Sequence, residues 1–103
     1  MSRRQIVSID FTYLDQCHTV KGRFAQTLGA LVNAGPRGVT ALEMQSWALR
    51  LGHYVWVLRH RYGLPIATET EPHDGGNHAR YKLNTEGLTI LDVQYREFER
   101  IAA

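Results

Sequence analysis

The sequence predicts a single small domain of the α+β class, and residues 40–83 carry most of that prediction. In order, this stretch gives a helix start, a short amphipathic helix, a longer helix that ends at Gly63, and a β-hairpin. Two helices followed by a hairpin are typical of the winged helix-turn-helix. We therefore expect a three-helix core with a β-hairpin wing over residues 20–83. An N-terminal strand or arm over residues 1–19 and a C-terminal helix over residues 84–103 complete the expected fold.

The first third of the chain predicts an extended segment and then a helix. Residues 5–13 are rich in β-branched and aromatic side chains, which favours a short strand or an arm packed on the domain. The first helix is expected over residues 20–34, where Gly35-Pro36 supplies a glycine stop and a proline barrier. Its core stripe consists of Phe24, Leu28, Leu31 and Val32.

The two helices of the predicted helix-turn-helix follow. Thr40 and Glu43 have capping-box spacing, which predicts a second helix over residues 41–47. A third helix is expected over residues 48–62, and Gly63 can end it. Four apolar residues recur on one face of the third helix, namely Leu51, Val55, Leu58 and Tyr62. Gly38-Val39, directly before Thr40, is the short bridge that often pairs with a wing strand in this topology.

The wing is predicted from two alternating segments, residues 66–71 and 78–83, around an Asp74-Gly75 turn. A two-residue turn places Glu71 opposite His78, Glu69 opposite Arg80, and Ala67 opposite Lys82. We expect Glu69 and Arg80 to form a cross-strand ion pair. Such a pair cancels charge on the strand and leaves the tip and Lys82 for phosphate, so the wing should make few phosphate contacts. A wing that faces a protein is the alternative.

After the wing, Asn84 is a suitable N-cap for a last helix over residues 85–101. An apolar stripe follows it at helical spacing, namely Leu88, Leu91, Tyr95, Phe98 and Ile101. A small monomer seldom leaves such a stripe exposed. The predicted helix therefore packs back on the domain or pairs with a second copy in a homodimer.

The charge is distributed unevenly, although the formal net charge is only +2. Residues 20–68 carry six basic residues against Glu43 alone, whereas residues 84–103 carry a net charge of −2. A basic reading surface with an acidic tail elsewhere is typical of a DNA-binding protein. The competing interpretation is chance clustering on a solvated surface.

The face of the third helix opposite its apolar stripe would enter the major groove. Arginine there can bind a guanine edge or phosphate, histidine can donate to either, and glycine allows a close approach. Trp56 is an unusual outward residue that either contacts a base edge, a thymine methyl or a sugar, or packs as core. The predicted DNA-binding residues on this helix and the wing are Arg50, Gly52, His53, Trp56, Arg59, His60, Arg61, His73, Asn77, His78 and Lys82.

Other classes of protein receive little support from the sequence. Cys17 cannot form an intramolecular disulfide, which favours a reducing, cytoplasmic setting and a buried or idle thiol. The chain has no apolar run long enough for a membrane span, and because no apolar stretch follows Met1-Ser2-Arg3-Arg4 we expect a soluble protein that is not exported. Neither Cys17-His18 nor the pair His73 and His78 has metal-ligand spacing, and no catalytic motif is present. We expect no metal, no cofactor and no enzymatic activity.

Residues 38–83 resemble the small winged-helix proteins of bacteriophages and proteobacterial prophages. The resemblance rests on the Leu58-Arg59 pair, the Gly63-Leu64-Pro65-Ile66 step and the Ala79-Arg80-Tyr81 strand, and it implies DNA binding by fold. Gly52, His53 and Trp56 depart from the pattern on the outward face, where they affect specificity and not the fold.

Together these observations predict a sequence-specific binder of double-stranded DNA, acting as a phage or prophage transcriptional regulator or accessory factor. The alternative from another class is a winged-helix module that binds a host protein.

Overall fold

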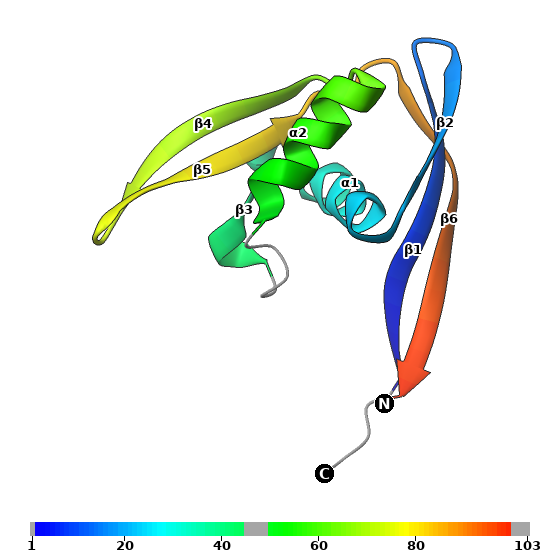
Figure 1. Ribbon diagram of the computed structural model, residues 1–103, viewed down its shortest axis with the longest axis horizontal. Coiled ribbons are helices and arrows are strands. Elements are labelled where there is room, and N and C mark those ends of the chain that lie inside the picture. Colours follow the sequence, from blue (N-terminus) through cyan, green and yellow to red (C-terminus); the bar gives the residue numbers. More distant parts are fainter. Residues whose placement is uncertain (1, 45–49, 100–103) are drawn as a thin grey trace.

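The structure is a computed structural model that describes residues 2–44 and 50–99. Two helices lie between two β-structures, as Figure 1 shows, and the molecule is flat, with extents of 43 × 39 × 20 Å. The elements in chain order are β1 (Ser2–Tyr13), β2 (Gln16–Lys21), α1 (Gly22–Ala34), η1 (Gly35–Arg37), β3 (Val39–Thr40), η2 (Ala41–Glu43), α2 (Leu51–Tyr62), β4 (Ile66–His73), β5 (Gly76–Leu83) and β6 (Leu88–Glu99).

Each of the two sheets has three antiparallel strands. One sheet has the order β2-β1-β6, and the other, which contains the wing, has the order β3-β5-β4. The core lies between the helices and the sheets because each element turns one apolar face inward. Fully buried side chains come from β1, β2, both helices and the segment after α2, namely Ile9, Phe11, Val20, Leu28, Leu31, Leu51, Val55, Leu58 and Leu64.

Several predicted elements are confirmed. α1 ends at Gly35, which has a positive φ of 61°, and α2 ends at Gly63 in the left-handed conformation. The carboxylate of Glu43 accepts hydrogen bonds from the backbone N–H and the hydroxyl of Thr40, as its part in a capping box requires. The wing hairpin has the predicted register, with Glu69 opposite Arg80, and β3 pairs with β5.

The predicted three-helix core is wrong for the described residues, which contain two α-helices. Where the second helix was expected, the capping box begins only the short 3-10 helix η2, over Ala41–Glu43. Residues 45–49, on which the rest of that helix and the start of the third were placed, lie outside the described residues. The helix predicted over residues 48–62 is observed as α2, over Leu51–Tyr62.

The predicted C-terminal helix is also wrong, because residues 88–99 form strand β6. β6 pairs along its length with β1 and completes the β2-β1-β6 sheet. Asn84 does make a local side-chain bond, accepting from the backbone N–H of Glu86, but that bond shapes a turn and caps no helix. The N-terminal strand is confirmed as β1, and it continues through a tight turn into β2, so residues 2–19 form two paired strands and not an arm.

The predicted ion pair between Glu69 and Arg80 is wrong although the register is right. Each carboxylate of β4 instead bonds to the basic residue two positions further along β5: Glu69 to Lys82 at 2.7 Å, and Glu71 to Arg80 at 2.6 Å. Diagonal neighbours on a twisted antiparallel pair lie within reach of long side chains. The Arg80 guanidinium also forms an ion pair with Glu43, at 3.0 Å.

Candidate nucleic-acid interface

Helix α2 turns its apolar stripe inward and a polar, aromatic face outward. Leu51, Val55 and Leu58 are buried, as predicted. Arg50, which is the N-cap residue of α2, is exposed, and so are the outward residues Gly52, His53, Trp56, His60 and Arg61. Six of the predicted DNA-binding residues are thus brought together on one face of one helix.

Trp56 lies on this outward face with 55% of its surface exposed, so its alternative interpretation as a core residue is wrong. Its ring packs on that of His60, with 4.5 Å between centroids and 36° between planes. The two residues are one helical turn apart, which is the spacing at which side chains meet. An exposed indole supported by a second ring offers a flat apolar contact beside the charged groups.

Arg59 is placed differently from its predicted neighbours on α2. Its guanidinium donates through Nε and Nη2 to the backbone oxygen of Ile66, at 3.1 and 2.7 Å, and through Nη2 to the hydroxyl of Thr68. The side chain is partly buried and ties the end of α2 to the start of β4. The Arg59 guanidinium therefore stabilises the junction between α2 and the wing.

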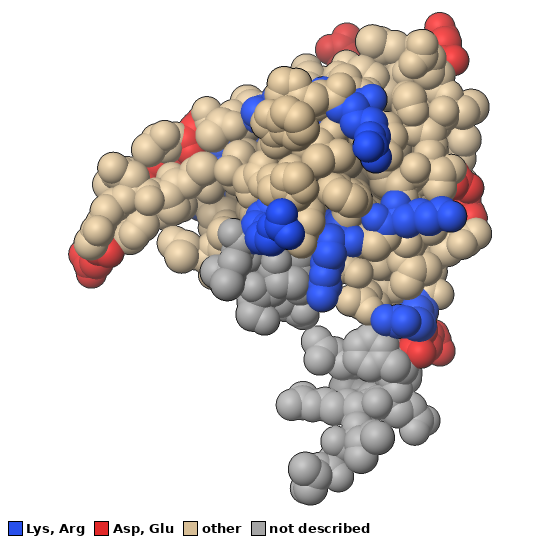
Figure 2. Space-filling view, viewed as in Figure 1, with Lys and Arg blue, Asp and Glu red and all other residues tan. Residues whose placement is uncertain are grey.

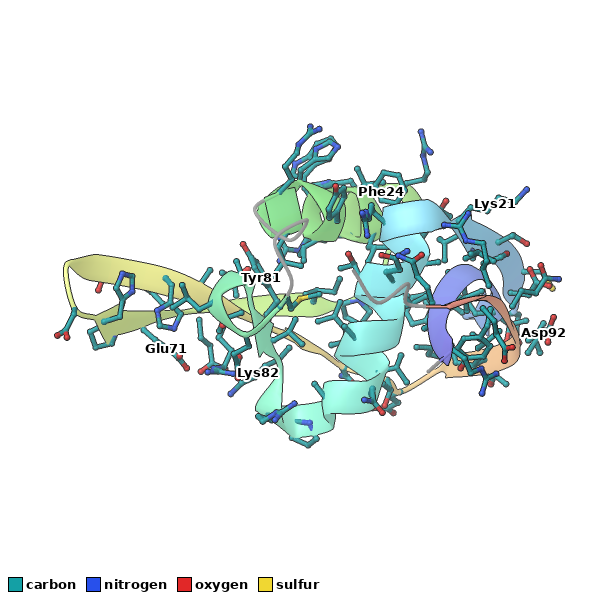
Figure 3. All side chains as sticks on the ribbon, turned by 90° about the horizontal axis from the view of Figure 1, so that it is seen from below. Lys21, Phe24, Glu71, Tyr81, Lys82 and Asp92 are labelled. Carbon is teal, nitrogen blue, oxygen red and sulfur yellow. The ribbon has the colours of Figure 1, made fainter. Side chains whose placement is uncertain are left out.

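The N-terminal end of α1 adds two cations that were not predicted as site residues. Phe24 packs against His53, with 6.4 Å between ring centroids, which brings the start of α1 beside α2. Figure 3 shows Lys21 and Phe24 on the same side of the molecule as the outward side chains of α2. Lys21 is the N-cap residue of α1, and Arg23 follows it within the first turn. The signal was present in the uneven charge of residues 20–68, but only the tertiary contact assigns these two residues to the face of α2.

We define the α2 surface as the outward residues of α2 and its N-cap together with the start of α1: Lys21, Arg23, Arg50, Gly52, His53, Trp56, His60 and Arg61. Neither α1 nor α2 contains an aspartate or a glutamate. Each helix has a basic N-cap residue and no side-chain cap bond, although a helix N-terminus favours negative charge. In Figure 2 the basic side chains spread over the middle of this face, and the acidic ones lie at its rim.

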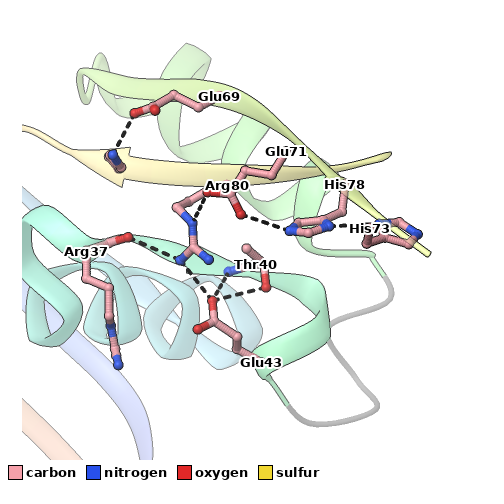
Figure 4. A network of polar contacts seen from close by, with 9 residues as sticks. Arg37, Thr40, Glu43, Glu69, Glu71, His73, His78 and Arg80 are labelled. Carbon is pink, nitrogen blue, oxygen red and sulfur yellow. Dashed lines mark hydrogen bonds and ion pairs between the residues drawn. The ribbon is translucent and has the colours of Figure 1, made fainter. Parts of the chain in front are cut away.

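The wing carries cations too, but its described residues neutralise them. Arg80 donates to Glu71 through Nε and to Glu43 through Nη1, and Nη1 also donates to the backbone oxygen of Arg37, at 3.2 Å (Figure 4). The Arg80 hydrogen bond lowers the pKa of the Glu71 carboxyl, and the Thr40 hydroxyl lowers that of Glu43. The hydrogen bond to Glu71 raises the pKa of the Arg80 guanidinium. These groups stabilise the base of the wing and leave little net charge for a ligand.

The predicted wing residues lie away from the α2 surface. Lys82 is ion-paired with Glu69. His78 donates from Nε2 to Glu71, at 3.0 Å, and its Nδ1 lies 2.8 Å from Nδ1 of His73. Asn77 and His73 are exposed near the tip. Figure 1 shows the wing extending to one side of the two helices, so the tip and the α2 surface are separate parts of the molecule.

Two further observations bear on the class of site. Within residues 2–44 and 50–99, no group of three or more histidine, cysteine, aspartate or glutamate side chains has the arrangement of a metal site. None of the helices there has the length and apolar character needed to cross a membrane. Cys17 is exposed, so of the two predicted alternatives, a buried or an idle thiol, the buried one is wrong.

A family model described as a winged helix domain matches residues 17–94, which run from β2 through both helices and the wing into β6. No curated protein and no solved structure matches the chain. The matched segment covers most of the chain and extends beyond residues 38–83, where the resemblance was recognised from the sequence. Membership of such a family indicates a DNA-binding role in general terms. The chain belongs to the winged helix domain family.

Proposed function

We propose that the protein binds double-stranded DNA in a sequence-specific manner through the α2 surface. The supporting observation is that neither α1 nor α2 contains an acidic residue, while the α2 surface combines four cations with the exposed Trp56 and its neighbouring ring, His60. A polyanion is the partner that such a surface fits best, because each lysine or arginine that meets a phosphate releases counterions. α2 supplies the groove-reading helix, and Trp56 and His60 supply the contacts to base edges.

In this proposal the protein is a transcriptional regulator or an accessory factor, acts in the cytoplasm and has no enzymatic activity. The resemblance of residues 38–83 to phage and prophage proteins supports a setting in phage biology. The wing contributes little to affinity, since its cations are paired within the protein.

The test is DNA binding at two salt concentrations. A gel shift of the full chain against genomic fragments should show some fragments bound preferentially, with affinity that falls steeply between about 50 and 200 mM salt. Trp56→Ala should weaken binding by about tenfold, or about 1.4 kcal/mol, while the melting temperature stays nearly unchanged. Leu14→Ala, which removes an exposed apolar side chain in the β1–β2 turn, is the matched control. Equal binding of all fragments would contradict sequence specificity.

The exposure of Trp56, together with the ion-paired cations of the wing, favours one second candidate, a protein-binding module. Tryptophan is one of the residue types enriched among the residues that dominate the binding energy at the centres of protein interfaces. An interface centred on Trp56 should depend weakly on salt. Fluorescence in a Trp47→Phe background, so that the signal belongs to Trp56, should be red-shifted in the free protein and change when either partner binds.

A further inference from the structure

Strand β6 forms one edge of the β2-β1-β6 sheet, and among the described strands only β1 pairs with it. β6 spans Leu88–Glu99, which is long for an edge strand. Two large apolar side chains on it are exposed, Leu91 at 57% and Tyr95 at 45%. A long, exposed and partly apolar edge is a template for pairing with another strand.

The polar face of the same sheet contains an acidic pair that no described cation neutralises. Asp92 lies directly opposite Asp10 in the register of β1 and β6. Asp10 accepts a hydrogen bond from the hydroxyl of Thr19, at 2.7 Å, and neither carboxylate has an ion-pair partner among the described residues. Like charges directly opposite each other on a sheet are destabilising, so a cation at the open side of β6 would be favourable.

The sequence of β6 can provide that cation from a second copy. Two identical antiparallel strands related by a two-fold axis place one residue opposite itself, and residues equally spaced about it opposite each other. Asp92, Gln94 and Arg96 alternate on one face. Of the registers centred on residues 92 to 96, only the one centred on Gln94 places Asp92 opposite Arg96. The registers centred on Asp92 or Arg96 place like charges opposite each other.

We propose that the outer edge of β6 is a dimerisation surface, where β6 of a second copy pairs antiparallel in the register centred on Gln94. Each Asp92 then meets the second copy's Arg96. On the other face, Val93 lies opposite the second copy's Tyr95, next to an open groove of about 910 Å³ that both residues line between the sheet and α1. The dimer has a continuous six-stranded sheet and covers part of Tyr95. The proposal stands on the strand edge alone and does not depend on DNA binding.

Cross-linking at the two-fold axis tests this register. Gln94 is exposed, and directly opposed residues of antiparallel strands have Cα separations that a disulfide can span. In a Cys17→Ser background, Gln94→Cys should form a covalent dimer on mild oxidation at low protein concentration. Gln16→Cys, an exposed residue at the start of β2, is the matched control and should remain monomeric. Equal cross-linking of both variants, or none in Gln94→Cys, would overturn the proposal.

Charge exchange tests the same register without a cross-link. By sedimentation equilibrium the unmodified chain should dimerise, and Asp92→Arg should raise the dissociation constant by about tenfold, because two symmetric pairs become repulsive. The double variant Asp92→Arg/Arg96→Asp should restore dimerisation. Asp92→Arg removes the repulsion from Asp10, so the monomer should stay folded by circular dichroism. A monomeric unmodified chain, or a double variant as weak as the single one, would overturn the proposal.

Discussion

The α2 surface and the wing both carry basic residues, yet they differ in what surrounds those residues. On the α2 surface the cations stand on two helices without a single acidic residue. On the wing, Arg80 and Lys82 each bond to a glutamate within the protein. A count of basic residues therefore does not locate a site for a polyanion. In our proposal the site lies where the cations stand on helices that contain no acidic residue, namely α2 and the start of α1.

The largest expected effect is a loss of DNA affinity, and it distinguishes the α2 surface from the wing. Replacing Arg50 and Arg61 together by alanine should lower affinity for DNA by about 100-fold and reduce the slope of log affinity against log salt by about 2. Lys82→Ala removes a cation from the wing and should change affinity by less than about twofold, because Glu69 already neutralises that charge. Gel shifts at several salt concentrations measure both. If Lys82→Ala lowers DNA affinity as much as the loss of one α2 arginine does, the proposed difference between the wing and the α2 surface is wrong.

A smaller effect is expected where the two regions meet. Arg59→Ala removes three hydrogen bonds between α2 and β4, two of them to a backbone oxygen. We expect this substitution to cost about 1–2 kcal/mol of unfolding free energy. Urea unfolding measures that loss, with Arg61→Ala, on the exposed side of the same helix, as the control. If Arg59→Ala instead keeps full stability and weakens DNA binding, Arg59 reads DNA as the sequence predicted.

Acid should destabilise the base of the wing. The pKa values of Glu43 and Glu71 are lowered from 4.5 in the folded protein, so the stability from these carboxylates is present above pH 4.5 and is lost as the pH falls through their folded values. Glu71→Gln should lower the melting temperature by a few degrees at pH 7 and flatten its decline below pH 4.5. Glu86→Gln, in the exposed loop before β6, should behave like the unmodified chain. If the melting temperature of Glu71→Gln falls as steeply in acid as that of the unmodified chain, other groups cause the decline.

The smallest effect is expected at the wing tip. His73→Ala removes an exposed ring that packs on His78, at 5.0 Å between centroids, away from the α2 surface. Stability should change by no more than about 0.5 kcal/mol, and DNA affinity should stay the same. Thermal melts and gel shifts check both quantities. A clear loss of DNA affinity would mean that the wing tip belongs to the DNA interface, and the two regions would then differ less than we propose.

Local signals predicted the helices and the wing because those elements depend on neighbours in the sequence. Glycine stops ended α1 and α2, the stripe of Leu51, Val55 and Leu58 gave the buried face of α2, and Asp74-Gly75 fixed the hairpin register. The exposed face of α2 followed from that stripe. The same reasoning could not assign Lys21 and Arg23, because the packing of α1 on α2 brings them to the site.

β6 could not be predicted because its partner, β1, lies at the other end of the described chain. Irregularities in the β1–β6 register near Ile6 and Asp10 break the strict alternation that marks a strand. Leu88, Leu91 and Tyr95 then fall by chance at helical spacing. The ion pairs of the wing could not be predicted for a related reason, since they depend on the twist of the hairpin and on tertiary contacts such as that between Arg80 and Glu43.

The pairing of β1 with β6 also sets an order of folding. The hairpins β1–β2 and β4–β5 join neighbouring segments, whereas the β1–β6 ladder joins Ser2 to Glu99. Local hairpins close within microseconds, and pairings between distant segments form late because the loop must close first. During synthesis, the edge of β1 that pairs with β6 therefore has no partner strand until almost the whole described chain has been made. Until then, that edge is open to mispairing and aggregation.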